Sequence, residues 1–269
     1  MNTWRLIHSG FQSGSMNMAL DEALLTAVAA GQSPPVLRFY RWRPATVTLG
    51  YGQSVATDID LPACREAGLD VVRRLTGGRA VLHDQEVTYA VIAPWSSPAF
   101  GHSVLDCYRV IADVLLATLR QLGLPAALVP GKPRGGPRNV ARAVCFSAPS
   151  QYELVIEGRK VAGSAQKRQG EVFLQHGSIP LEMDLALLGR VLKTASRPGE
   201  TEQLASVGWL NHWAAKPFTQ EVVETRLAEQ FAAGLQCHWQ VSEPSAAEQA
   251  MALKLCHEKY GHPDWNLKR

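Results

Sequence analysis

Apolar residues recur at helical spacing near the start of the chain, in residues 16–31. The positions on this face are Met16, Ala19, Leu20, Ala23 and Leu24. Residues three and four apart lie on one side of a helix, so the spacing predicts a helix with an apolar face. Ser15 is a suitable N-cap, and Gly31 is a suitable stop because glycine tolerates the left-handed conformation that ends many helices.

A clearer helical pattern covers residues 103–124, with Ser103 as its expected cap. Its apolar stripe consists of Tyr108, Ile111, Leu115, Leu119 and Leu122. We interpret this stripe as core packing, the usual role of such a face. Residues 217–235 and 245–261 have similar spacing and predict two helices towards the C-terminus.

Alternation with a period of two predicts strands in residues 45–53 and 86–94, and Val87, Tyr89 and Val91 are expected on one face. Residues 70–78 indicate a strand that runs into a turn. Residues 151–181 indicate a strand, a Glu-Gly turn, a strand, a loop and a further strand. Helices and hairpin-like strands are interleaved irregularly. The pattern therefore favours an α+β or mixed α/β fold over a doubly wound parallel sheet.

Composition narrows the class of protein without identifying a function. The chain has 269 residues, 46% hydrophobic and 19% charged, with a formal net charge of +3. This charge is too small to indicate nucleic-acid binding. The first residues lack a signal-peptide core and no apolar run reaches membrane-spanning length, so we expect a cytoplasmic protein. The cysteines are Cys64, Cys107, Cys145, Cys237 and Cys256; none forms a C-x-x-C pair, so neither a metal site nor a disulfide framework is expected.

Residues 73–90, RRLTGGRAVLHDQEVTYA, are the first candidate for chemistry. Arg73 and Arg74 are fixed cations, and the two glycines after Thr76 let the backbone turn or approach a ligand closely. A tight turn flanked by surface arginines explains the same residues, and spacing does not decide between the two. His83 is followed by an aspartate, but adjacent strand residues point to opposite faces, so the two side chains need not interact.

Cys145, in VCFSAPS, is the second candidate, because it follows a basic segment broken by glycine and proline. The cations of that segment are Lys132, Arg134, Arg138 and Arg142. Nearby cations favour the reactive thiolate, which makes Cys145 a candidate nucleophile. The alternative is a small buried side chain, the usual role of a cysteine.

Residues 157–166, EGRKVAGSAQ, and residues 174–178, LQHGS, complete the set. Lys160 is either a surface lysine near a turn or a cation that acts on a cysteine or a carbonyl. The small residues Gly163, Ser164 and Ala165 suggest that a ligand or another backbone packs tightly over them. His176 on a strand is either a hydrogen-bonded core histidine or a cavity liner.

These four stretches occur together and in this order, as RRLTGGRAVLHDQEVTYAV, CFSAPSQYEL, EGRKVAGSAQKR and LQHGSIPL. In that combination the chain resembles the lipoate-protein ligase and octanoyltransferase superfamily, from about Ser15 to about residue 240. The resemblance implies a mixed α/β catalytic domain like that of biotin and lipoate protein ligases. We expect this domain to span residues 1–240, with a C-terminal helical extension, residues 241–269, packed on it.

Within the superfamily, Cys145 lies fifteen residues before Lys160, which resembles the LipM-type octanoyltransferases. That resemblance implies that Cys145 carries an acyl-thioester and that Lys160 lowers its pKa. The residues it assigns to substrate binding are Arg74, Thr76, Gly77, Gly78, His83, Gly163, Ser164, Ala165 and His176. Val81, Tyr89 and Leu174 are expected as walls of an apolar slot for the octanoyl chain, so that residues 73–84 shape an acyl tunnel and no phosphate cradle.

The same resemblance implies partners. The donor is acyl carrier protein, docked by the basic segment that includes Arg142, and the acceptor is a lipoyl domain or the glycine-cleavage H protein. No cofactor, metal, nucleic acid or membrane is expected. Three alternatives stay open: an amidotransferase that moves octanoyl between lipoyl domains, an ATP-dependent lipoate-protein ligase, and a non-catalytic binder of lipoyl domains or carrier protein. ATP-dependent ligases typically have a third glycine where Arg79 stands, which favours the transferase, as does a C-terminal part too short for an accessory domain. The presence of both Cys145 and Lys160 argues against the binder.

Overall fold

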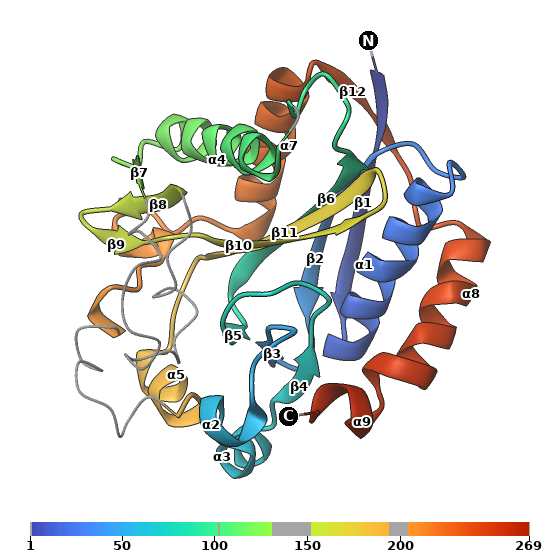
Figure 1. Ribbon diagram of the computed structural model, residues 1–269. Coiled ribbons are helices and arrows are strands. Elements are labelled where there is room, and N and C mark those ends of the chain that lie inside the picture. Colours follow the sequence, from blue (N-terminus) through green and yellow to red (C-terminus); the bar gives the residue numbers. More distant parts are fainter. Residues whose placement is uncertain (1, 102, 131–151, 194–203, 269) are drawn as a thin grey trace.

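A six-stranded mixed sheet organises the computed structural model, which describes residues 2–101, 103–130, 152–193 and 204–268 (Figure 1). In sheet order the strands are β10 (Gly163–Gln169), β11 (Val172–Pro180), β6 (Glu86–Pro94), β2 (Val36–Trp42), β1 (Asn2–Gln12) and β12 (Cys237–Val241). Neighbours from β10 to β2 are antiparallel, whereas β1 runs parallel to both β2 and β12. The mixed α/β class predicted from the irregular pattern is confirmed.

Helices cover both faces of this sheet. On one face α1 (Gly14–Ala29) packs against β2, β6 and β11, and α8 (Ala246–Leu255) packs on the outer side of α1 (Figure 1). On the other face α4 (Val104–Gln121) and α7 (Gln220–Leu235) pack together. Strand β6 serves both cores as its alternation predicts: Val87, Tyr89 and Val91 join the α4–α7 side, and Ala90 and Ile92 join the α1 side.

Two three-stranded sheets flank the main one. Their strands are β4 (Asp70–Arg73), β3 (Thr46–Leu49) and β5 (Val81–His83), and β7 (Ala127–Pro130), β8 (Tyr152–Ile156) and β9 (Arg159–Lys160). The short helices are α2 (Val55–Asp58), α3 (Leu61–Glu66), α5 (Leu185–Val191), η2 (Leu210–His212), the π-helical turn η3 (Cys256–Tyr260) and α9 (Pro263–Asn266). Among the described residues, no helix is long and apolar enough to cross a membrane.

The C-terminal helices lie along the first half of the chain. Both α8 and η3 contact α1, and α9 contacts β4. A buried ion pair reinforces this packing, because Arg5 on β1 binds Glu248 on α8 at 2.6 Å. The expected domain boundary at residue 240 stays a prediction.

The structure differs from the sequence pattern at the N-terminus. Ser13, and not Ser15, caps α1, because its hydroxyl accepts from the Met16 N–H at 3.3 Å. Gly14, the first residue of the helix, packs closely against β3, because a Cβ there would lie 2.7 Å from the Thr46 side chain. Neither β1 nor β12 was predicted. In β1 the four consecutive residues 4–7 are all buried, so this part shows no alternation, and it includes the paired Arg5.

A substitution at Gly177 tests the packing of the sheet under α4 and α7. An alanine Cβ there would lie 2.7 Å from the Tyr89 ring, which is fully buried. We expect Gly177→Ala to lower the free energy of unfolding by about 1–3 kcal/mol in urea denaturation. Gly189→Ala on α5 is the control, because its nearest neighbour would be 3.4 Å away and alanine favours a helix. Equal stability of Gly177→Ala and the wild type would contradict this packing.

Candidate active site

The glycine loop, residues 76–79, lies between β4 and β5 and approaches two other segments closely. A Cβ at Gly50 would lie 2.2 Å from the Gly78 carbonyl oxygen, so the two backbones meet where a side chain cannot fit. Gly78 also adopts a φ of +95°, a conformation that favours glycine. On its other side, a Cβ at Gly78 would lie 3.8 Å from the Cβ of Ala165 on β10. Two of the predicted stretches are therefore neighbours in space.

Arg74 holds the backbone of this loop. The side chain is buried, and its guanidinium donates to the carbonyls of Gly77 at 3.0 Å and Arg79 at 2.9 Å. It also donates to the carbonyl of Thr48 at 3.0 Å and to its hydroxyl at 2.5 Å. The sequence suggested either a ligand-binding cation or a surface arginine beside a turn. Arg74 is neither, because it is buried and these contacts are all with the protein itself.

His176 on β11 reaches the same loop from the main sheet. Its Nε2 lies 2.7 Å from the Thr76 hydroxyl, and its Nδ1 lies 2.9 Å from Oδ2 of Asp21 on α1. Because a carboxylate only accepts hydrogen bonds, the Nδ1–H of the neutral ring donates to Asp21 and Nε2 accepts from Thr76. The predicted residues Thr76 and His176 are thus brought together.

The electrostatics of this pair follow from burial. Burial lowers the pKa of His176 and outweighs the attraction of Asp21, so the ring is neutral at neutral pH. Burial would raise the pKa of Asp21, but the His176 hydrogen bond and the Arg38 guanidinium together hold that pKa below its usual value. Arg38 lies 2.6 Å from the carboxylate. Asp21 is therefore a fixed anion that orients a neutral imidazole.

His83 is buried below the loop and has partners on both ring nitrogens. Its Nε2 lies 2.8 Å from the Thr48 hydroxyl, and its Nδ1 lies 2.7 Å from the Glu86 carboxylate. The ring also stacks on Trp42 with centroids 4.2 Å apart. Through Thr48 the histidine is linked to Arg74, so both histidines belong to one buried polar network around the glycine loop.

The predicted small residues of β10 are divided between two faces of the sheet. Ser164 binds the Tyr89 hydroxyl at 2.7 Å on the α4–α7 side, whereas Ala165 and its register partner His176 face the glycine loop. Tyr89 and Leu174 likewise belong to opposite cores. The expectation that Tyr89 and Leu174 form walls of the same slot is therefore wrong, because their side chains point to opposite faces of the sheet.

Lys160 lies on β9, at the entrance to β10. The side chain is buried, and its Nζ donates to Glu153 Oε1 at 3.2 Å, across the hairpin formed by β8 and β9. This ion pair fixes the cation within the fold, which excludes the alternative of a surface lysine. Cys145 and the basic segment with Lys132, Arg134, Arg138 and Arg142 lie outside the described residues.

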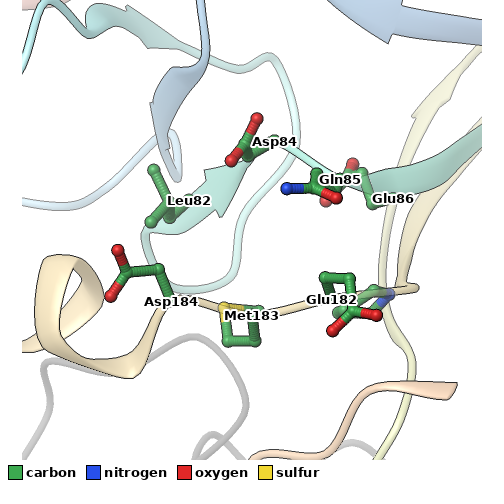
Figure 2. Close-up of a pocket in the computed structure, with 8 residues that line it drawn as sticks. Leu82, Asp84, Gln85, Glu86, Glu182, Met183 and Asp184 are labelled. Atoms are coloured by element: carbon green, nitrogen blue, oxygen red, sulfur yellow. The ribbon is translucent and has the colours of Figure 1, made fainter. Parts of the chain in front are cut away.

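An acidic cleft of about 550 Å³ lies beside the β5–β6 turn (Figure 2). It is lined by Leu82, Asp84, Gln85, Glu86, Pro180, Glu182, Met183 and Asp184. Partial burial and the nearby Glu86 and Asp184 carboxylates raise the pKa of Asp84. His83 points into the core whereas Asp84 lines this cleft, which confirms that the two need not interact. Within the described ranges, no cluster of His, Cys, Asp or Glu could hold a metal ion.

Sequence reasoning missed the residues that complete the network. Asp21, Arg38 and Glu86 are at most 2% exposed, yet none was a candidate. A signal existed at Asp21, a carboxylate among the apolar positions of the first helix. Arg38 and Glu86 lie in strands whose other residues are largely apolar. A charge at an otherwise buried position needs a partner, and here each of them has one.

Comparison with known proteins finds a single family model and close relatives over nearly the whole chain. Residues 13–232 match the lipoyl protein ligase A/B catalytic domain. A protein named octanoyltransferase LipM from Geobacillus kaustophilus is 43% identical, with 99% of this chain and 98% of that protein covered. Its counterpart from Bacillus subtilis is 42% identical, with 99% of each chain covered.

Solved structures share the fold. A crystal structure of lipoate-protein ligase A bound with ATP superposes with a TM-score of 0.83 and 25% identity, covering 99% of both chains. The expected likeness to catalytic domains of lipoate-protein ligases is confirmed.

The buried imidazole predicts a specific pH dependence. A histidine whose pKa in the folded state lies below its ordinary value of 6.5 binds fewer protons folded than unfolded. The free energy of unfolding should therefore fall as pH decreases below about 6.5. In urea denaturation between pH 7.5 and 5, we expect the free energy of unfolding to decrease less steeply with falling pH in His176→Gln than in the wild type. His257→Gln, at an exposed position of η3, should keep the wild-type slope. Parallel slopes for all three proteins would refute a neutral buried His176.

Proposed function

The chain belongs to the lipoyl protein ligase A/B catalytic-domain family, and on this basis we propose that it is an octanoyltransferase of lipoate biosynthesis. The observation that carries the proposal is 43% identity over 99% of the chain to a protein named octanoyltransferase. The sequence also has both residues that the chemistry needs, a thiol at Cys145 and a cation at Lys160.

The proposed reaction moves an octanoyl group from acyl carrier protein to a lysine of a lipoyl domain or of the glycine-cleavage H protein. The Cys145 thiolate attacks the carbonyl carbon of the donor thioester. A new carbon–sulfur bond forms and the donor thiol leaves with a proton. The acceptor amine then attacks the acyl-enzyme, an amide forms, Cys145 is released and the amine gives up a proton. This division into two steps is covalent catalysis.

Lys160 supplies positive charge to this reaction. Its ion pair with Glu153 holds the ammonium at the hairpin of β8 and β9, which precedes β10 in the chain. A cation close to a thiol favours the thiolate, and it also stabilises the oxyanion of a tetrahedral intermediate. We assign Lys160 to the first role, with Glu153 as the residue that keeps it in place.

The glycine loop forms part of the acyl-binding wall in this proposal. Gly77 and Gly78 are exposed and carry no side chain, so an extended hydrocarbon can lie directly on their backbone. The basic segment before Cys145 docks the acidic carrier protein. Because the donor is already a thioester, the reaction needs neither ATP nor a metal nor another cofactor. We expect it to take place in the cytoplasm.

Intact-protein mass spectrometry tests the proposal. The purified protein is mixed with octanoyl-acyl carrier protein without ATP, and we expect one octanoyl group, mapped to Cys145 and removed by an added lipoyl domain. Cys145→Ala should keep the wild-type circular dichroism spectrum and form no adduct. An adduct only from an octanoylated lipoyl domain would identify the amidotransferase. Turnover that needs ATP and persists in Cys145→Ala would identify a ligase.

The role of Lys160 is tested by thiol alkylation. Replacing the cation in Lys160→Gln should slow the reaction of Cys145 with iodoacetamide at pH 7 by roughly tenfold, because less thiolate is present. Glu153→Gln keeps the cation and removes only its ion-pair partner, so we expect a smaller decrease in the alkylation rate. Equal alkylation rates in Lys160→Gln and the wild type would remove Lys160 from the activation of the thiol.

A further inference from the structure

Arg73 lies at a junction between two segments that are far apart in the sequence. It belongs to the end of β4, next to Arg74, and its side chain is fully buried. On one side is the turn of residues 50–53, and on the other is the C-terminal segment, residues 263–268. The proposed reaction assigns no role to either segment.

The guanidinium of Arg73 binds backbone carbonyls of both segments. Its acceptors are Gly50 at 2.9 Å, Tyr51 at 3.3 Å, Gln53 at 2.8 Å, Trp265 at 3.2 Å, Asn266 at 3.1 Å and Lys268 at 2.8 Å. The carbonyls at the end of α9 lack partners within the helix, and Arg73 provides them. Because the guanidinium is a rigid planar fork, its position fixes both segments at once.

The backbone of Arg73 is tied to the same C-terminal segment. Its N–H donates to Oδ1 of Asn266 at 2.9 Å, and the Trp265 indole donates to its carbonyl at 2.9 Å. The Lys268 ammonium lies over both the Trp265 ring, at 3.5 Å, and the Tyr51 ring, at 4.4 Å. The C-terminal segment therefore contacts the turn directly as well as through Arg73.

The turn of residues 50–53 itself supports the glycine loop. The Tyr51 N–H donates to the Thr76 carbonyl at 2.8 Å, and Gly50 packs against Gly78 where no side chain fits. A continuous set of contacts thus runs from the C-terminal segment through Arg73 and the turn to the loop that borders the candidate acyl site. Displacement of the turn would remove one support of the loop, while its hydrogen bonds to Arg74 and His176 would remain.

We propose that the C-terminal segment is a positioning element of the acyl-binding site and that Arg73 transmits its effect to the glycine loop. This inference rests on the proposed function for its consequence in catalysis. The segment touches no reacting atom. It holds the wall against which the octanoyl chain lies, so its loosening weakens binding of the acyl donor and leaves transfer from the acyl-enzyme unchanged.

The test uses the full-length chain with Asn266→Ala, which removes the acceptor of the Arg73 N–H. Hydrogen exchange of peptides that cover residues 50–53 and 76–79 should accelerate at least about threefold. The KM for octanoyl-acyl carrier protein should rise by a similar factor, with little change in the rate at which isolated acyl-enzyme reacts with a lipoyl domain. Trp265→Phe is the second variant, because it keeps an aromatic ring and removes the indole N–H that binds the Arg73 carbonyl, and it decides the result if Asn266→Ala does not fold.

Two controls separate positioning from general stability. Leu267→Ala shortens the neighbouring side chain, which is 44% exposed, and should leave exchange and KM at wild-type values. Phe231→Leu destabilises the opposite core on α7 and should not raise the KM for the donor. Wild-type exchange at the glycine loop, together with faster exchange at residues 263–268, would overturn the inference. If the wild type forms no acyl-enzyme, the proposed function fails, and the exchange measurement still decides whether the segment supports the loop.

Discussion

The ion pair between Asp21 and Arg38 is the interaction on which the candidate site depends. Both side chains are at most 2% exposed, and burying two charges in this way is costly unless hydrogen bonds complete their environment. Arg38 also donates to Asn17 and Ser9, and the Tyr40 hydroxyl donates to Asp21 at 3.0 Å. The pair fixes α1 on β2 in one register. It leaves one carboxylate oxygen for His176, so the tautomer of that histidine and its bond to the glycine loop follow from it.

Arg73 and Arg74 show how adjacent residues at a strand end divide two structural tasks. Arg74 binds carbonyls of the glycine loop, whereas Arg73 binds carbonyls of the turn and of the C-terminal segment. Each task requires several N–H donors in a fixed plane, which arginine has and lysine lacks. In the sequence the pair suggested either a ligand site or a polar surface. The structure shows a third role for a buried cation: its N–H groups donate hydrogen bonds to backbone carbonyls of segments outside the regular helices and strands.

The regular helices and strands were predictable because each of their apolar faces packs into one hydrophobic core. The stripe of α4 and the alternation of β6 correspond directly to the cores that they enter. Strand β1 was not predictable, because its residues 4–7 are buried without alternation and include Arg5, whose partner Glu248 is more than two hundred residues away. Within the site, Thr76 and His176 were found by pattern and resemblance. Their hydrogen bond, and its dependence on Asp21, arise only from the tertiary structure. Such contacts between distant residues leave no periodic trace in one sequence.

In the proposed function the glycine loop binds a hydrocarbon and not a phosphate. A loop that binds phosphate directs several backbone N–H groups, and usually a cation, towards the anion. Here the guanidinium of Arg74 donates to the carbonyls of Gly77 and Arg79, so an anion could recruit it only by displacing those bonds. The N–H of Tyr51 is likewise bound to the Thr76 carbonyl. The loop exposes the side-chain-free backbone of Gly77 and Gly78 next to Ala165. Under the proposed function this surface takes the acyl chain, and the positive charge for thioester chemistry comes from the Lys160–Glu153 pair on the hairpin of β8 and β9.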